Sequence, residues 1–270
     1  MDYLGREAAP FSEDLWRRID DAVTSAASET LVARRFLPFF GPVGPGLGII
    51  GINAPGRTEI FKDGFSTMEG RRLAQVPQLY EDFWLFWRDL EQTARAGLPE
   101  EISAARTAAQ NLARREDQMI FNGVKELGLD GILTVKGAGV QTRGDWQAGE
   151  DAFKDVAAAI AALQKKGRHG QYVVATSPDL FTALHRIQPG AGLLELERVK
   201  SLVGGRLFMS AVLEPNTAFM LCAQPQYIDL AVGQDIKTAY AELVDLNHHL
   251  RIVETAILRI KAPDAIVIFK

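Results

Sequence analysis

The stretch from residue 36 to residue 80 constrains this fold most, because its glycines and prolines break helices and leave little to build a core. Five glycines and four prolines lie between residues 38 and 55 alone. Only short β-prone pieces separate them, such as Ile49-Ile50 and Thr58–Phe61. So long a stretch is too long for an ordinary connection inside a compact domain. We therefore predict an extended arm or hairpin that packs against another chain.

An amphipathic helix is predicted before this arm. Ser12 is a good N-cap, and Phe11 and Trp16 occupy the positions of a hydrophobic staple. Apolar residues then recur at spacings of four, which indicates a buried helical face up to about Leu31. They are Leu15, Ile19 and Val23.

Beyond the arm come an aromatic run and a long helix, and from about residue 130 helices and strands alternate. An aromatic run occupies residues 79–87, and a long helical stripe runs from Pro99 to Gly128. Residues 152–166 read as an alanine-rich helix, and short strands and helices follow. Residues 250–260 alternate apolar and polar side chains, as a half-buried strand does. The fold class is therefore predicted to be α+β.

Composition excludes several classes of function. The chain has 270 residues, 47% hydrophobic and 24% charged, with a formal net charge of −4. That balance argues against nucleic-acid binding by bulk positive charge. We expect no membrane span, no signal peptide and, with Cys222 as the only cysteine, no internal disulfide framework. These features predict a cytoplasmic protein.

No recognisable active site emerges, so we expect no enzyme. The pair His248-His249 is expected on a loop or surface, and no serine nucleophile elbow is present. Glu116-Asp117 could serve acid–base or metal chemistry. We favour capping or pairing with Arg114 or Arg115. Trp84 and Trp87 could stack a flat cofactor, but packing is the favoured interpretation.

Six motifs in order resemble one known family over nearly the whole chain. They are Leu4–Pro10, Ala33–Phe36 followed by Gly41-Pro42, Glu116–Gly123, Gly170–Tyr172, Gly233–Ile236 with Tyr240, and Glu254–Ala265. This order resembles the encapsulins, also called linocin-type shell proteins.

The resemblance implies the HK97-like fold of tailed-phage capsid proteins. An N-terminal helix would occupy residues 1–39 and an E-loop residues 40–80. A P-domain would combine residues 81–130 with 223–270, and an A-domain would span residues 131–222. The E-loop would exchange between subunits, which suits the unpaired arm.

The resemblance also implies function. The chain would assemble into a closed icosahedral shell of 60 copies or a multiple of 60, about 1.8 MDa at minimum. The shell would enclose a cargo protein, ferritin-like or a dye-decolorising peroxidase, for iron storage or oxidative-stress defence. The alternatives are a prophage major capsid protein and a stand-alone enzyme, for which no nucleophile–base pair is recognisable.

Site residues follow from the same resemblance. The targeting peptide of the cargo would bind Arg34, Phe36, Ile236 and Tyr240. A loop at the five-fold pore would carry His185, Arg186, Gln188 and Gly190. Some relatives bind flavin through a tryptophan after the arm. Trp87 lies near that position without matching it, so we expect no cofactor and no metal.

Overall fold

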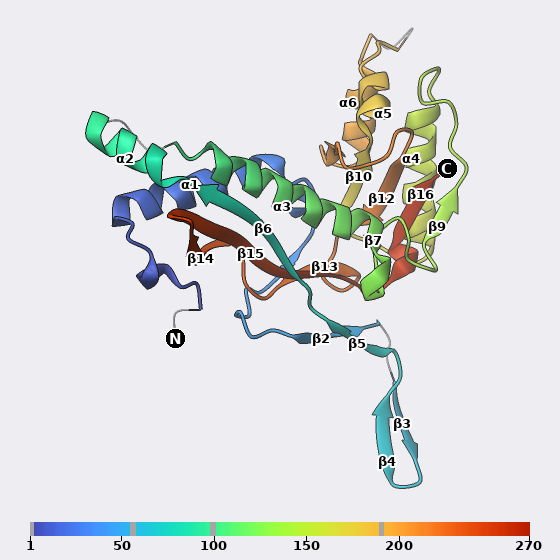
Figure 1. Ribbon diagram of the computed structural model, residues 1–270. Coiled ribbons are helices and arrows are strands. Elements are labelled where there is room, and N and C mark those ends of the chain that lie inside the picture. The colour runs from blue at the N-terminus through green and yellow to red at the C-terminus, as the bar shows by residue number, and fades with distance from the viewer. Residues whose placement is uncertain (1–2, 55–57, 98–100, 189–191) are drawn as a thin grey trace.

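The computed structural model describes residues 3–54, 58–97, 101–188 and 192–270. Two five-stranded sheets, two long helices across one of them and a projecting arm dominate the architecture (Figure 1). The helices are α1 (Glu13–Thr30), α2 (Trp87–Ala96), α3 (Ser103–Asn122), α4 (Asp151–Lys165), α5 (Pro178–Ala183) and α6 (Glu195–Leu202), with the 3-10 turns η1 (Arg6–Ala8), η2 (Ala33–Arg35), η3 (Lys125–Leu127) and η4 (Pro263–Ala265).

The first sheet carries the body of the molecule. Its order is β1 (Phe39–Phe40), β13 (Ile228–Val232), β15 (Asn247–Ile260) and β14 (Lys237–Val244), and β6 (Gln78–Leu85) also pairs with β15. Only the pairing of β1 with β13 is parallel. Helices α1 and α3 lie side by side on one face of this sheet, where their apolar stripes form the larger core (Figure 1).

Helix α1 confirms the predicted N-terminal helix. The Ser12 hydroxyl accepts a hydrogen bond from the Leu15 N–H at 3.1 Å, as an N-cap does. The Phe11 and Trp16 ring centroids lie 5.4 Å apart and form the staple. The predicted face of Leu15, Ile19 and Val23 is buried.

The second sheet joins strands from residues 139–222 to the last strand of the chain. Its order is β11 (Leu207–Met209), β10 (Tyr172–Thr176), β12 (Ala218–Cys222), β16 (Ile266–Phe269) and β9 (Gly139–Gln141). We expected residues 223–270 in the P-domain, but β16 is a central strand of this sheet. All four of its residues are buried, so it needs a partner on each side.

The arm projects away from both sheets (Figure 1). Strands β2 (Ile49–Asn53) and β5 (Arg71–Gln75) pair at its base, and β3 (Glu59–Lys62) and β4 (Phe65–Met68) form a hairpin at its end. Phe61 and Phe65 on this hairpin are 74% and 80% exposed. A lone two-stranded hairpin is marginal in water, so these rings need cover from outside the subunit.

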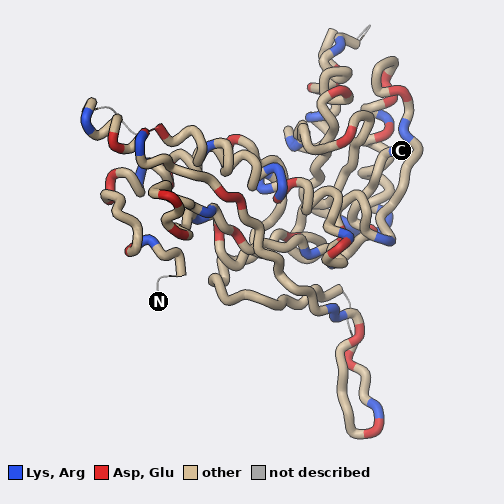
Figure 2. Tube along the Cα trace, in the orientation of Figure 1, with Lys and Arg blue, Asp and Glu red and all other residues tan. Residues whose placement is uncertain are grey.

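Charged residues of both signs are interspersed along the described chain (Figure 2). One ion pair of opposite charges, Arg259 with Asp229, is buried at the base of the arm. Arg259 bonds both carboxylate oxygens of Asp229, at 2.7 and 2.6 Å, and lies over the Phe40 ring. The short pair β7 (Gly123–Val124) and β8 (Leu129–Asp130) completes the structure. No helix within the described ranges is long and apolar enough to span a bilayer.

Candidate functional site

A groove of about 440 Å³ lies between the end of α1, the turn η2 and the connection from β13 to β14. Its lining residues are Thr24, Ala27, Ser28, Leu31, Arg34, Arg35, Asp235, Ile236 and Lys237. Two of the four residues predicted to bind cargo, Arg34 and Ile236, therefore meet here. A larger cavity of about 670 Å³ between β6 and α3 contains none of the four.

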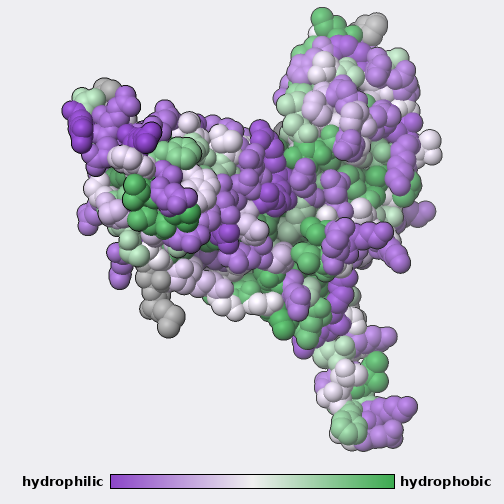
Figure 3. Space-filling model, in the orientation of Figure 1, coloured by the Kyte–Doolittle hydropathy of each residue, from purple (hydrophilic) through white to green (hydrophobic). Residues whose placement is uncertain are grey.

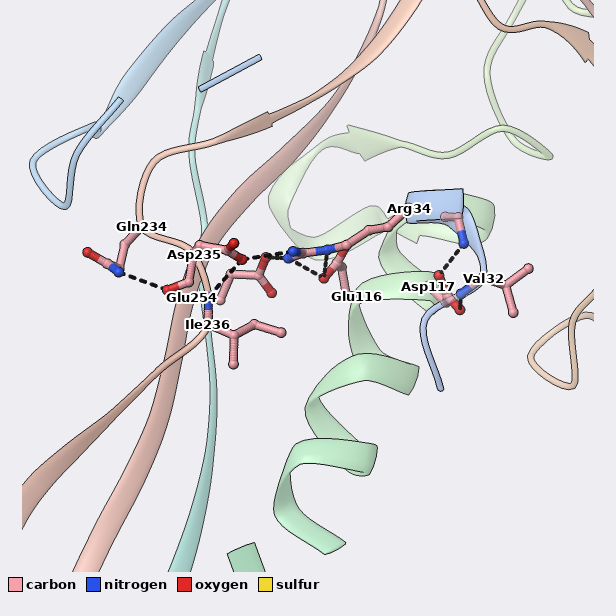
Figure 4. Close-up of polar contacts among 9 residues, drawn as sticks. Val32, Arg34, Glu116, Asp117, Gln234, Asp235, Ile236 and Glu254 are labelled. Carbon is pink, nitrogen blue, oxygen red and sulfur yellow. Dashed lines mark hydrogen bonds and ion pairs between the residues drawn. The ribbon is translucent and has the colours of Figure 1, made fainter. Parts of the chain in front are cut away.

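Arg34 is the polar centre of this region, and it faces inward (Figure 4). Its Nε lies 2.9 Å from Glu116 Oε1, and its Nη1 lies 2.8 Å from Asp235 Oδ1. Its Nη2 contacts Glu254 Oε1. The carboxylates of Glu116 and Glu254 are completely buried, and the Arg34 side chain is 15% exposed. One guanidinium thus joins α3, β15 and the β13–β14 connection.

The charges in this cluster shift one another. Burial opposes the charge on Arg34, but Glu116 and Glu254 outweigh it and raise the Arg34 pKa above its ordinary value. Burial, together with the neighbouring charge of Glu116, raises the pKa of Glu254 well above its ordinary value. Burial also opposes the charge on Asp235, yet the hydrogen bond from Arg34 keeps that pKa low. One arginine therefore pairs with three carboxyl groups, so the cluster holds more acidic than basic groups.

Asp117 caps the chain where α1 gives way to η2 (Figure 4). Its two carboxylate oxygens accept hydrogen bonds from the Val32 and Ala33 N–H groups at 2.9 and 3.0 Å. Burial raises the pKa of Asp117 to about 7, against the lowering effect of these two donors. The expectation that Glu116-Asp117 serves capping and ion pairing is therefore confirmed.

The expected partner of the pair was wrong. Glu116 binds Arg34 rather than Arg114 or Arg115, and Arg115 instead pairs with Glu81 at 2.7 Å. The next-neighbour arginines lie on the outer side of α3, whereas Glu116 faces inward. Within the described residues, no group of three histidine, cysteine or acidic side chains could hold a metal ion.

The other two predicted cargo residues lie outside the groove. Phe36 is buried in the core, with its ring centroid 5.4 Å from that of Phe208. Tyr240 packs on Phe11, and its N–H donates to the Leu4 carbonyl at 2.8 Å. Their binding of cargo stays a prediction, and the structure gives both a role within the subunit.

Sequence reasoning missed Leu31 and Asp235 as groove residues and Glu254 as part of the charge cluster. Asp235 could have been predicted, because it precedes Ile236 in the motif Gly233–Ile236. Glu254 opens the motif Glu254–Ala265, but nothing local pointed to its partner Arg34, which is 220 residues away.

Hydrogen bonds tie the described residues of the predicted pore loop to other parts of the same chain. His185 is exposed, and its Nδ1 lies 3.0 Å from the Phe181 carbonyl oxygen. Arg186 donates to the carbonyls of Ala183 at 2.9 Å and Gly149 at 2.7 Å, and buried Gln188 also donates to Gly149. Gly190 lies outside the described residues. A pore function for this loop stays a prediction.

The histidine pair does not lie on a loop. His248 and His249 belong to β15, where neighbouring side chains point to opposite faces. His248 is buried against Phe11, and His249 stacks on Trp84 with ring centroids 4.5 Å apart. The expected loop position was wrong because the aromatic rings that cover each face come from distant parts of the chain.

Comparisons with known proteins agree on one family. The family model Linocin_M18, described as an encapsulating protein for peroxidase, matches residues 1–257. A type 1 encapsulin shell protein of Myxococcus xanthus is 34% identical over 273 residues, covering 98% of this chain and 95% of that protein. A diheme-cytochrome–encapsulin shell fusion protein of Kuenenia stuttgartiensis is 36% identical over 258 residues, covering 93% and 71% respectively.

Solved structures agree on the fold. A virus-like particle protein from Pyrococcus furiosus superimposes with a TM-score of 0.77 at 19% identity, covering 94% of this chain and 99% of that one. Phage capsid proteins also share the fold. The expected HK97-like α+β architecture is therefore confirmed.

Proposed function

Since this chain belongs to the encapsulin family and forms the shell of a nanocompartment, we propose that the groove beside α1 binds the targeting peptide of its cargo. The observation that carries the proposal is the composition of the groove. The half-buried Ile236 side chain lines it over the buried Ala27 and Leu31, and Arg35 and Lys237 stand beside it. An apolar peptide fixed by a few charges suits such a groove.

The cargo that we propose is a ferritin-like protein or a dye-decolorising peroxidase. The shell would then serve iron storage or defence against oxidative stress. The description of the family as an encapsulating protein for peroxidase supports the peroxidase, and a ferritin-like–encapsulin shell fusion protein of Pyrococcus furiosus supports the ferritin-like protein. The relatives support a nanocompartment rather than a prophage capsid.

The shell that we propose has 60 copies or a multiple of 60 and acts in the cytoplasm, with a mass of about 1.8 MDa at minimum. A buried thiol at Cys222, unpaired with any other cysteine, supports a reducing compartment. The subunit itself would act structurally, with chemistry left to the cargo.

The groove is tested by cargo loading in co-expressed shells. The probe is a fluorescent protein fused to the C-terminal tail of a dye-decolorising peroxidase from the same source. Ile236→Asp places an unpaired charge in the apolar part of the groove, so loading should fall by about tenfold or more. Ile236→Val is the matched control and should load normally. Equal loading of the Asp variant and the wild-type shell would refute the proposal.

A further inference from the structure

Arg6 bridges the two elements that form the walls of the groove. Its Nη1 and Nη2 bond the two carboxylate oxygens of Asp20 on α1, at 2.8 and 2.6 Å. Its Nε donates to the carbonyl oxygen of Thr238 on β14 at 2.8 Å. The guanidinium also lies over the Trp16 ring, 4.5 Å from the ring centroid. We call this side chain, with its contacts to Asp20 and Thr238, the Arg6 bridge.

The Arg6 bridge lies at one end of the groove. On α1, Thr24 lines the groove, and Asp20 lies on the same helical face one turn earlier. On the opposite wall, Lys237 lines the groove, and Thr238 is the next residue of β14. The bridge therefore closes the space between α1 and β14 at the point where the lining of the groove stops.

The segment that carries Arg6 is itself held against β14. The Tyr240 N–H donates to the Leu4 carbonyl at 2.8 Å. Gly5 has a positive φ of 63°, and a Cβ at this position would lie 2.7 Å from the Tyr240 carbonyl oxygen. Glycine allows this close approach, because it has no Cβ. The chain before α1 therefore lies close to β14 (Figure 1), and this contact fixes the place from which the Arg6 side chain starts.

The other end of the groove differs from the end at the Arg6 bridge. Exposed Arg35 and Asp235 line it, just beyond the end of α1. A tail that joins a folded cargo protein must leave the groove toward that protein. A tail that follows the groove can leave it beside these two residues but not past the Arg6 bridge. The free end of the tail must then lie at the bridge.

The charges of the groove favour a carboxylate at this free end. Asp235 is engaged by Arg34, at 2.8 Å, whereas Lys237 is an exposed cation. Lys237 is also the lining residue next to Thr238 of the Arg6 bridge. A terminal carboxylate is attracted to this ammonium group, and a terminal ammonium group is repelled by it.

A blocked end also gives the tail a single register. Hydrophobic residues show on the surface at this end of the molecule, below α2 (Figure 3). Apolar contact is non-directional, so apolar surface alone would hold a tail in several positions. With one end blocked, only one of these positions brings the terminus of the tail to the Arg6 bridge.

We propose that the groove accepts the extreme C-terminus of a cargo tail, with the Arg6 bridge as the stop that sets its length and Lys237 as the partner of its terminal carboxylate. The proposal rests on cargo binding in the groove and adds which part of the cargo chain can enter it. An internal segment of the same sequence would have to continue through the Arg6 bridge, so it should bind poorly.

Two tails that differ only beyond their last residue test the stop. A fluorescent protein carries either the native peroxidase tail or the same tail followed by Gly-Ser-Gly-Ser, and each is co-expressed with the wild-type shell. The extension should lower loading by about fivefold or more. Equal loading of the two tails would overturn the proposal. A wild-type shell that loads neither tail would instead overturn cargo binding in the groove, which keeps the two failures distinct.

Arg6→Ala tests whether this side chain is the stop. The substitution opens the space between α1 and β14, so these shells should load the extended tail within about twofold of the native tail. Arg17→Ala is the matched control, because Arg17 also pairs with an acidic residue of α1 but is 69% exposed. Its shells should reject the extended tail as the wild type does.

Asp20→Asn provides a second variant in case Arg6→Ala shells do not form. It weakens the same contact while it keeps the Arg6 side chain, and it should raise the ratio of extended to native tail in the same direction. Intact shells of either variant that reject the extended tail as strongly as the wild type does would overturn the proposal.

Lys237→Glu tests the terminal carboxylate. The reversed charge should lower loading of the native tail by about fivefold. Arg17→Glu makes the same change of charge on the exposed side of α1 and should load the native tail normally. Equal loading by these two variants would overturn the role of Lys237.

Discussion

Replacing Arg34 by alanine should destabilise the subunit strongly, whatever it does to cargo. The substitution removes the cation that pairs with Glu116 and Glu254, whose side chains are both completely buried. Removing one partner of a buried ion pair costs about 3–5 kcal/mol, because the other charge stays buried without compensation. Because Arg34→Ala leaves two buried carboxylates without a partner, its cost should lie toward the upper end of this range.

The assay is thermal unfolding of purified shells at one fixed scan rate. At about 2 °C per kcal/mol for a chain of this size, the midpoint should fall by roughly 6–10 °C. Arg35→Ala is the matched control, since Arg35 lines the same groove and donates to the exposed backbone carbonyl of Glu29 at 2.9 Å rather than to a buried carboxylate. Its midpoint should stay close to that of the wild type.

The deficit of Arg34→Ala should also shrink as the pH falls. Burial already raises the pKa of Glu254 in the wild type, and losing Arg34 raises it further. A carboxyl whose pKa is raised by folding stabilises the protein while it is protonated and loses that contribution as the pH rises through its folded pKa. A deficit that is equal at pH 5 and pH 8, or absent beside Arg35→Ala, would refute this reasoning.

Two further predictions concern the cap and the arm. Because burial raises the pKa of Asp117 to about 7, its contribution to stability is full below the unfolded value of about 4 and is lost as the pH rises through 7; Asp117→Asn should remove that slope from a series of unfolding midpoints between pH 5 and pH 8. Replacing Phe61 and Phe65 together by serine should leave the subunit within about 0.5 kcal/mol of wild-type stability but shift it from particles to subunits on size-exclusion chromatography, whereas Ser66→Ala on the same hairpin should assemble normally.

Local patterns predicted the parts of the fold that local physics decides. Ser12 and the apolar spacing of four were enough for α1, because capping and amphipathicity act within a few residues. The arm was predicted because glycine and proline exclude helices whatever surrounds them. The pairing of β16 with β12 and β9 was not predicted, since a short buried strand carries no sign of which sheet it will join.

The same limit applies to the residues of the groove, whose binding of cargo stays a prediction. Motif order placed Arg34 and Ile236, and the structure brings them to one groove. The same motifs also carried Phe36 and Tyr240, which pack within the subunit. Motif order does not show whether a matched side chain faces the groove or the core. The partner of Glu116 lies 82 residues away, so chain neighbours were the wrong place to look.

A substitution at Arg34 is therefore a poor test of cargo recognition, although the resemblance singles that residue out. The guanidinium holds η2, α3 and the β13–β14 connection together, and those elements form the walls of the groove. Losing Arg34 would deform the groove even if no peptide atom ever touched it. Ile236 packs in the groove without taking part in the ion pairs. Loss of loading in Ile236→Asp shells, with particles intact, would report on binding where Arg34→Ala would report first on folding.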